Sequence, residues 1–324
     1  MYKREILERL RRGGPISGEE LGRTIGISRT AVWKYVNELK SEGYAIDSLP
    51  GKGYCFVSAP DALLPEEIRA GLKTQVMGRD IAYQKETPST QEIAKALASQ
   101  GVAEGTIVVA ETQSKGRGRV GRQWSSPQGG VYFSIILRPD MKPSEALRLP
   151  LVAGVAVAHA IKHGTKLYPR LKWPNDIMLG SNKIGGILTE MNAEMDRLDW
   201  VVVGIGLNVN TSHKSFPADV EGAATSLMEA GGKSITRVKL LQDILFEFES
   251  LYDDLVKSGF EPIRTKWKAL SNTIGANVVV SMPTEKVTGT AVDIDSDGAL
   301  ILKKEDGSLE KIIAGVVSLR KLQE

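Results

Sequence analysis

A loop at residues 114–124 carries the side chains and glycines best suited to binding an anion. It contains four basic residues and three glycines and has no acidic residue. Glycines leave backbone N–H groups accessible and permit positive φ, which an anion-binding concavity requires. Arginine guanidinium groups match phosphate oxygens two at a time. Taken alone, this glycine–arginine loop is equally consistent with a flexible basic segment that has no specific ligand.

Four further segments supply polar groups that could complete a binding site. Residues 89–91 place two hydroxyls and an amide at the predicted start of a helix, and residues 172–176 pair a lysine with an aspartate across a proline turn. Lys183 stands at the start of a predicted strand whose glycines allow close approach by a ligand. Residues 204–210 form the end of a predicted buried strand and carry two asparagine side chains there. Each pattern by itself is common, but the whole set in this order indicates a single site.

The elements that would position these segments form a mixed domain of helices and strands. Helices are predicted at residues 91–98, with Ser89 or Thr90 as the cap, and at residues 150–161, which are rich in alanine and valine. The predicted strands cover residues 106–110, 131–137, 170–173, 183–190 and 200–206. This pattern predicts an α+β domain with a multi-stranded mixed sheet, in which the glycine–arginine loop connects two strands.

The first sixty residues predict a different and smaller unit. Apolar spacing indicates a helix at residues 3–12, a second helix between the cap Ser17 and Gly26, and a longer third helix after the cap Ser28. A hairpin is predicted within residues 44–57. A helix, a tight glycine turn, a helix with basic residues in its first turns and a hairpin wing are typical of a winged helix-turn-helix, which lays its recognition helix in a DNA major groove.

The expected DNA contacts lie on the outer face of the third helix and at the tip of the wing. They are Ser28, Arg29, Thr30, Trp33, Lys34 and Lys52. The same segment is also consistent with a helical protein-interaction module whose basic residues are incidental. Trp33 could equally pack beneath the wing.

Residues 272–324 predict a small β domain. Short apolar or alternating bursts are separated by turns rich in aspartate and glycine, and they occur at residues 278–281, 286–294, 299–302 and 310–313. This pattern predicts a small barrel, which could contribute packing alone.

Composition limits the classes of protein that fit. Hydrophobic residues make up 42% of the 324 residues and charged residues 25%, which is typical of a soluble globular chain. The single cysteine, Cys55, excludes an internal disulfide and a cysteine-built metal site. No apolar run reaches about 18 residues, and the start lacks the apolar segment of a signal peptide. We therefore expect a cytoplasmic protein with no membrane partner, whose net charge of +3 still permits local basic patches.

The glycine–arginine loop, residues 172–176 and Lys183 together resemble the biotin–protein ligase family, and the resemblance covers essentially the whole chain. The winged helix-turn-helix makes the chain similar to the bacterial members that are both ligase and biotin operon repressor. The resemblance implies an α+β multidomain fold. Its parts are a winged helix-turn-helix domain at residues 1–62, a catalytic ligase domain with a mixed sheet at residues 63–271 and an SH3-like β-barrel at residues 272–324.

The resemblance also implies a two-step reaction. Members of the family join biotin to ATP, which yields biotinyl-5′-AMP and pyrophosphate, and then transfer biotin to a lysine of a biotin carboxyl carrier protein of the acetyl-CoA carboxylase type. Biotinyl-5′-AMP would also act as corepressor for operator DNA, which a homodimer would bind at two half-sites. Two alternatives remain open: a transcription regulator that senses a small molecule without turnover, and a lipoate-type ligase.

The residue roles that the resemblance implies fall into three groups. The catalytic cations are Arg119, Lys172 and Lys183. The biotin contacts are Ser89, Thr90, Gln91, Gln113, Arg117, Gly118, Arg119 and Lys183, and the nucleotide contacts are Arg122, Trp124, Lys172, Asp176, Gly206 and Asn208. Mg²⁺ would be held near Asp176, with ATP and biotin as substrates. Gln91 departs from the family pattern, which often has the shorter asparagine at this position.

Overall fold

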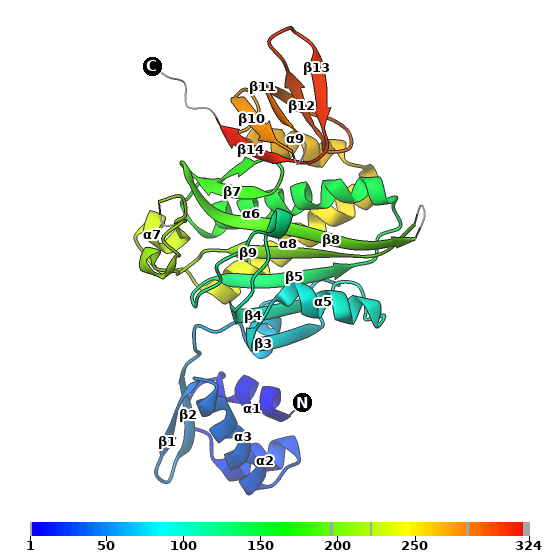
Figure 1. Ribbon diagram of the computed structural model, residues 1–324. Helices are drawn as coiled ribbons and strands as arrows, with labels where there is room; N and C mark the ends of the chain where they lie inside the picture. The colour runs from blue at the N-terminus through cyan, green and yellow to red at the C-terminus, as the bar shows by residue number, and fades with distance from the viewer. Residues whose placement is uncertain (1, 195–196, 221, 283–284, 320–324) are drawn as a thin grey trace. The chain divides into compact units, whose positions relative to one another are not determined.

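In the computed structural model the chain divides into two compact units, Met1–Ala62 and Leu63–Glu324. The structure describes residues 2–194, 197–220, 222–282 and 285–319, and Figure 1 labels most of their helices and strands. Each unit buries its own set of apolar side chains.

Three helices and a two-stranded hairpin make up the described part of the first unit. They are α1 (Tyr2–Leu10), α2 (Gly18–Ile25), α3 (Arg29–Ser41), β1 (Ala45–Leu49) and β2 (Gly53–Ser58). Ser17 Oγ accepts a hydrogen bond from the Glu20 N–H at 3.1 Å, and Gly26 ends α2 with a left-handed φ of 78°. Ser28 Oγ caps α3 in the same way, by accepting from the Ala31 N–H at 3.1 Å. The predicted helices, caps and hairpin of this unit are confirmed.

The apolar spacing along α3 decides which of its faces is buried. Val32, Val36 and Leu39 are fully buried, as predicted, and pack toward α1 and α2. Trp33 is 58% exposed, so it does not pack beneath the hairpin. The outer face of α3 therefore presents an aromatic ring beside the exposed basic residues Arg29 and Lys34.

A seven-stranded mixed sheet forms the centre of the second unit. Its order is β3-β4-β5-β9-β8-β7-β6, in which β3 and β4 are parallel and the other neighbours are antiparallel. The strands are β3 (Ile81–Thr87), β4 (Ile107–Gln113), β5 (Val131–Leu137), β6 (Arg170–Lys172), β7 (Asp176–Leu179), β8 (Asn182–Glu194) and β9 (Arg197–Leu207). The predicted mixed sheet is confirmed, while β3 and β7 carried no prediction.

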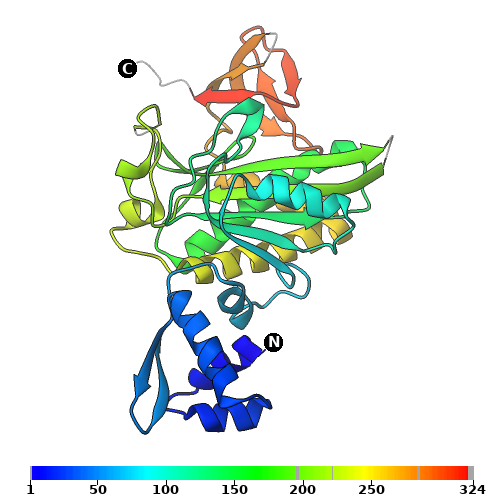
Figure 2. The same ribbon diagram turned by 60° about the horizontal axis from the view of Figure 1, so that its bottom comes forward.

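Helices cover both faces of this sheet. The helices of this unit are α4 (Pro65–Ala70), α5 (Thr90–Ser99), α6 (Leu149–Gly164), α7 (Leu227–Gly231), α8 (Arg237–Ser258) and α9 (Glu261–Leu270). On one face, Ala94 and Ala98 of α5 pack on Val108, Ile136 and Val202. The alternate strand residues belong to the core on the other side of the sheet. The helices α6 and α8 cover that side (Figures 1 and 2).

One helical segment within the described chain, Pro143–Gly164, is long and apolar enough by composition to cross a membrane. It comprises the 3-10 turn Pro143–Arg148 and α6, and 67% of its most apolar window is buried inside the unit. Its side chains pack against α8, α9 and the sheet. The segment is therefore placed as the central core helix of this unit.

The last five described strands form a small antiparallel sheet in the order β13-β12-β11-β10-β14. They are β10 (Asn277–Ser281), β11 (Lys286–Ile294), β12 (Leu300–Lys303), β13 (Leu309–Ile312) and β14 (Val316–Leu319). The first four follow the predicted bursts, and β14 carried no prediction. This small sheet belongs to the same compact unit as the seven-stranded sheet.

Trp173 joins the two sheets. Its side chain is 2% exposed, and its indole Nε1 donates to Gly298 O at 3.0 Å. Its backbone N–H donates to Thr273 Oγ1 at 2.9 Å. These hydrogen bonds place the small sheet beside residues 172–176, where it can contribute to a site on the larger sheet.

Candidate active site

A cavity of about 680 Å³ lies on the α5 face of the seven-stranded sheet, beside the first turn of that helix. Its volume is typical of a small-molecule site. All but one of the ligand residues predicted from the sequence line it: Ser89, Thr90, Gln91, Gln113, Arg117, Gly118, Arg119, Arg122, Trp124, Asp176, Lys183, Gly206 and Asn208. Lys172 is not a lining residue, but its Nζ lies 3.9 Å from Oδ2 of the lining residue Asp176.

A buried polar network forms the end of the cavity at the start of α5. The Thr90 N–H donates to Gln113 Oε1 at 2.8 Å, and the Thr90 and Ser134 hydroxyls lie 2.9 Å apart. Gln113 Nε2 donates to Ser126 Oγ at 2.8 Å. Buried polar groups held in this way present donors and acceptors in fixed directions, which suits a small polar ring rather than a phosphate chain.

Gln91 bridges the sheet instead of projecting freely into the cavity. Its Nε2 donates to the backbone oxygens of Val202 at 3.2 Å and Leu188 at 3.5 Å, and its Oε1 accepts from Ser134 Oγ at 3.1 Å. A Cβ on Gly204 would collide with Gln91 Oε1. The extra methylene relative to asparagine is thus accommodated because β9 has a glycine at this position.

Trp124 lies flat on a pair of glycines in the middle of the sheet. Gly186 of β8 and Gly206 of β9 are direct cross-strand partners, and a Cβ on Gly206 would collide with Trp124 Nε1. Lys183 Nζ lies 5.3 Å from the centroid of the Trp124 ring, within the range of a cation–π contact. The ring therefore forms a flat wall with a cation beside it.

Two buried polar atoms near this wall lack a hydrogen-bond partner among the described residues. They are Trp124 Nε1 and Asn208 Oδ1. Asn208 is 2% exposed, and its Nδ2 donates to Thr225 O at 3.1 Å, which fixes the direction of its oxygen. Because buried polar groups are nearly always paired, a free donor and a free acceptor here indicate a ligand with polar ring atoms.

Cations dominate the part of the cavity around Asp176. Lys183 Nζ lies 2.5 Å from Asp176 Oδ1, and Arg122 is a further lining residue. Burial lowers the pKa of Lys172, and the neighbouring charges of Lys183 and Arg122 act in the same direction while Asp176 opposes them. The two lining carboxylates, Asp176 and Asp219, are outnumbered by the four cations Arg119, Arg122, Lys172 and Lys183, and this net positive charge suits phosphate or carboxylate groups.

Arg119 connects three parts of the structure. Its Nη1 lies 3.3 Å from both Asn175 Oδ1 and Gly315 O, so the glycine–arginine loop touches the turn before β7 and the small sheet. Burial lowers the pKa of Arg119 and Asp176 opposes this shift, although an arginine remains charged in either case. The guanidinium therefore lies where it can respond to a charged ligand at Asp176.

The glycine–arginine loop folds back on itself as an irregular hairpin along one side of the cavity. The Gly118 N–H donates to Arg122 O at 2.7 Å, and the Trp124 N–H donates to Gly116 O at 2.9 Å. Val120 at its tip is 74% exposed and has a φ of 54°. A β-branched residue at positive φ is strained, and such strain is concentrated in ligand-binding segments.

Several lining residues carried no sequence-based prediction. They are Phe216, Pro217, Asp219, Val220, Ala223 and Ala224 from one loop, and Gly315, Val316 and Val317 from the small sheet. The first loop is held to β8 because the Lys183 N–H donates to Ala223 O at 2.8 Å and the Thr225 N–H donates to Lys183 O at 3.0 Å. Neither segment has unusual composition, so only the fold brings them to the site.

Comparisons with known proteins agree with this geometry. The sequence profile of the biotin/lipoate A/B protein ligase family matches residues 83–208, an HTH domain profile matches residues 3–55, and the biotin protein ligase C terminal domain profile matches residues 273–320. The bifunctional ligase/repressor BirA of Bacillus subtilis (strain 168) is 41% identical over 98% of each chain. The biotin–[acetyl-CoA-carboxylase] ligase of Paracoccus denitrificans is 33% identical over 68% of this chain and 93% of its own length.

A solved structure of similar fold contains ligands. The biotin protein ligase from Aquifex aeolicus, in complex with biotin and ATP, superposes with a TM-score of 0.65 at 34% identity and covers 75% of this chain and 99% of its own. The similarity to the Bacillus protein extends over the helix-turn-helix as well as the ligase region. The chain therefore belongs to the biotin/lipoate A/B protein ligase family, among its bifunctional ligase/repressor members.

Proposed function

We propose that the chain is an ATP-dependent biotin–protein ligase and a biotin operon repressor. It forms biotinyl-5′-AMP, transfers biotin to a lysine of a biotin carboxyl carrier protein of the acetyl-CoA carboxylase type, and uses the same adenylate as corepressor. One observation carries the proposal: a single cavity combines a buried polar pocket, a cluster of cations and an aromatic wall. These three parts match the ring of biotin, the charged reacting groups and the adenine.

The biotin end of the cavity is the polar network at the start of α5. Ser89, Thr90, Gln91 and Gln113 supply hydroxyl and amide groups there, and Arg117, Gly118 and Arg119 lie along its side. Lys183 lines the same cavity, and its Nζ lies 5.3 Å from the centroid of the Trp124 ring. In this arrangement the biotin carboxylate points toward Lys183, where the nucleotide part of the cavity begins.

Adenylate formation brings two anions together. An oxygen of the biotin carboxylate forms a bond to the α-phosphorus of ATP, while the bond from that phosphorus to the bridging oxygen breaks and pyrophosphate leaves. Positioning and charge neutralisation dominate the catalysis of such a step. Arg119 and Lys183 supply positive charge at the cavity surface. Lys172 lies behind Asp176 and offsets the negative charge of that carboxylate. In the second step the carrier lysine is the nucleophile, so this chain needs none.

The nucleotide end of the cavity is built from Trp124, Gly206 and Asn208. Trp124 packs against the adenine, and Asn208 Oδ1 accepts from it. Among the described residues no group of three or more histidine, cysteine, aspartate or glutamate side chains could hold a metal ion. Asp176 with its single carboxylate fits Mg²⁺ that arrives with the nucleotide, because Mg²⁺ is commonly held by one or two carboxylates plus substrate phosphates. It would neutralise phosphate charge there, and Arg122 would contribute alongside it.

Pyrophosphate release on mixing the chain with biotin and ATP tests the ligase directly. We expect one equivalent of pyrophosphate in a single turnover without carrier protein and continued release when carrier is added. Silence with a functional carrier would favour a regulator that senses a small molecule without turnover. Faster release with lipoate than with biotin would favour a lipoate-type ligase.

Substitution of Gly206 by alanine is expected to weaken ATP binding about tenfold, because the new methyl group would displace the Trp124 ring from the sheet. Biotin binding without ATP should change much less. Isothermal titration with each ligand measures both effects. Gly164→Ala is the control, since its added Cβ meets no atom within 4 Å. Equal losses for biotin and ATP would contradict the assignment of this wall to the nucleotide.

The repressor half of the proposal rests on the first unit. Arg29, Thr30, Trp33 and Lys34 are exposed on α3, and Lys52 is exposed in the turn between β1 and β2. Ser28 is exposed as well, but its hydroxyl caps α3. The backbone N–H groups of Ser28 and of the first turn of α3 would therefore be the groups that contact a DNA phosphate. A basic recognition helix with a basic wing tip suits binding to an operator in the cytoplasm.

Substitution of Lys52 by glutamine should weaken binding to operator and unrelated DNA by a similar factor. A wing-tip lysine contacts phosphate rather than bases. The negative slope of log affinity against log salt concentration should therefore become shallower by about 0.9. Fluorescence anisotropy with labelled duplexes at several salt concentrations measures this slope. The exposed Lys166→Gln of the second unit serves as control. A loss confined to operator DNA would assign Lys52 to base recognition instead.

The adenylate is proposed to favour a homodimer that reads two half-sites. A single winged helix-turn-helix makes few phosphate contacts, so useful affinity needs a second copy. Linkage then requires DNA and adenylate to tighten each other's binding by the same factor. Sedimentation with and without biotin plus ATP tests this. An unchanged sedimentation coefficient together with unchanged operator affinity would contradict the corepressor role.

A further inference from the structure

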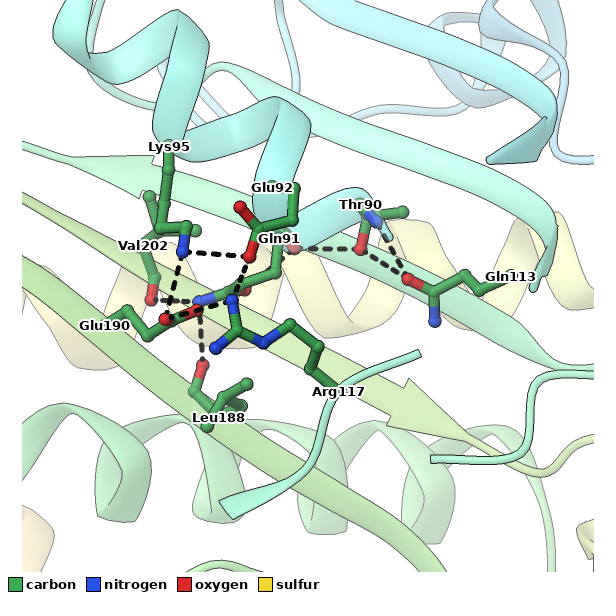
Figure 3. A network of polar contacts seen from close by, with 10 residues as sticks. Thr90, Gln91, Glu92, Lys95, Gln113, Arg117, Leu188, Glu190 and Val202 are labelled. Atoms are coloured by element: carbon green, nitrogen blue, oxygen red, sulfur yellow. Dashed lines mark hydrogen bonds and ion pairs between the residues drawn. The ribbon is translucent and has the colours of Figure 1, made fainter. Parts of the chain in front are cut away.

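Four charged side chains meet beside the cavity-lining residues Gln91 and Leu188, and three of the four have no role so far (Figure 3). Glu92 and Lys95 project from α5, Glu190 from β8, and Arg117 from the glycine–arginine loop. Lys95 Nζ lies 2.9 Å from Glu92 Oε1 and 3.1 Å from Glu190 Oε1. Arg117 Nη1 contacts Glu92 Oε1 and lies 3.6 Å from Glu190 Oε1. The Arg117 guanidinium is thus directed to two carboxylates.

Without Arg117, the carboxylates of Glu92 and Glu190 would have more negative charge than their remaining partner, Lys95, can balance. Glu92 and Glu190 then share the single positive charge of Lys95. Arg117 approaches Glu190 through Oε1, while Oε2 stays buried without a hydrogen-bond partner among the described residues. The net negative charge of Glu92, Glu190 and Lys95 suits an arginine, whose fork of donors can serve two carboxylates.

The charges in this cluster support one another. The hydrogen bond from Lys95 lowers the pKa of Glu92, and Arg117 lowers it further. Burial by itself would lower the pKa of Lys95, but the hydrogen bonds with Glu92 and Glu190 outweigh burial and raise it. Glu92 and Lys95 therefore stabilise each other in their charged forms.

The cluster lies where the loop meets the wall of the cavity. Leu188 lines the cavity, and Glu190 follows it by two residues on the same face of β8. Gln91 and Glu92 are adjacent on α5, so the helix also contributes one lining residue and one cluster residue. Because Arg117 belongs to the glycine–arginine loop, its ion pairs hold the first half of that loop against α5 and β8.

We propose that Glu92 and Glu190 form a receptor for Arg117 that latches the glycine–arginine loop over the cavity and slows the escape of bound biotin. The identity of the ligand rests on the proposed function, whereas the latch is a property of the loop itself. Glu92 and Glu190 are positioning residues in this scheme, because they act through Arg117. Arg117 then contributes to biotin binding by closing the cavity with its side chain.

A cycle of variants tests the latch through the dissociation rate of biotin, followed by stopped-flow tryptophan fluorescence. E92Q/E190Q and R117Q should each release biotin about three- to tenfold faster, as expected for a partly exposed ion-pair cluster. The combined variant should be no faster than either, because all three lack the same contact. Glu86→Gln, an exposed glutamate on β3, is the matched control. Faster release by R117Q alone, with E92Q/E190Q unchanged or slower, would place Arg117 on the ligand and overturn the latch.

A second measurement needs no ligand. Lys115 and Arg122 in the loop are exposed, so trypsin reports how often the loop opens. Cleavage of ligand-free E92Q/E190Q should be about three- to tenfold faster than that of the unaltered chain and of Glu86→Gln. Salt at about 0.5 M should speed cleavage of the unaltered chain toward that of the variant, because it screens exposed charges. Equal cleavage rates would overturn the latch, whereas failure of the unaltered chain to bind biotin would contradict only the proposed function.

Discussion

Substitution of Lys183 by methionine is expected to lower the rate of biotinyl-5′-AMP formation by roughly 100- to 1000-fold, the range for loss of one positioned electrostatic group. Lys183 Nζ lies 2.5 Å from Asp176 Oδ1 and 5.3 Å from the centroid of the Trp124 ring, beside the groups that we assign to the nucleotide. Its backbone is held on both sides by Ala223 and Thr225, which directs the side chain before any ligand binds. Methionine replaces most of the unbranched lysine side chain but removes the charge where two anions must meet.

Single-turnover pyrophosphate release measures this effect, with the exposed Lys162→Met of α6 as the matched control. Lys183→Arg should retain part of the rate, because it preserves the charge with different geometry. Affinity for DNA in the absence of biotin and ATP should be unchanged. If Lys183→Met instead weakened only biotin affinity and left the single-turnover rate at saturation intact, the residue would be a binding contact without a catalytic part.

Substitution of Arg237 by methionine is expected to destabilise the second unit by about 3–5 kcal/mol, the range for breaking a buried ion pair by removing one partner. Arg237 is 1% exposed at the start of α8, and its Nη1 donates to Glu111 Oε2 and to Gly130 O, each at 2.9 Å. Glu111 Oε1 accepts from the Leu63 N–H at 2.6 Å. Methionine would leave the carboxylate buried with its charge uncompensated.

Denaturant titration followed by tryptophan fluorescence measures the loss, because four of the five tryptophans, all except Trp33, belong to the second unit. The double variant Arg237→Met/Glu111→Gln should recover much of the stability, since glutamine can still accept from Leu63 without a buried charge. Lys257→Met removes an exposed ion pair on the same helix and should leave the unfolding midpoint unchanged. Additive losses in the double variant would contradict this account.

Most of the first unit could be predicted from its sequence because its signals are local. Ser17 and Ser28 cap helices within three residues, and the glycine that ends α2 is required by its left-handed φ. Five of the seven strands of the ligase region were also predicted, whereas β3 and β7 were not. By contrast, α8 and α9 received no prediction, although Leu241, Leu245 and Phe248 of α8 recur at helical spacing and are buried.

The candidate site shows the same division. Residue type and spacing identified the glycine–arginine loop, the turn before Asp176, Lys183 and the amides after β9, since glycine, arginine and amide chemistry can be read without coordinates. Which of these groups face one another could not be read in this way. Lys172 was expected in the site, and the structure places it outside the lining, in contact with Asp176.

By itself, therefore, the sequence determined the chemical parts of this protein: an anion-binding loop, a basic helix-turn-helix and the strands that carry polar ends. The tertiary structure alone decided that Gly186 and Gly206 pair beneath Trp124, that Gly315 reaches Arg119, and that Glu92 and Glu190 meet Arg117. The physical reason is that these contacts join residues far apart in the chain. They depend on strand order and register, which a packed core specifies and a local pattern does not.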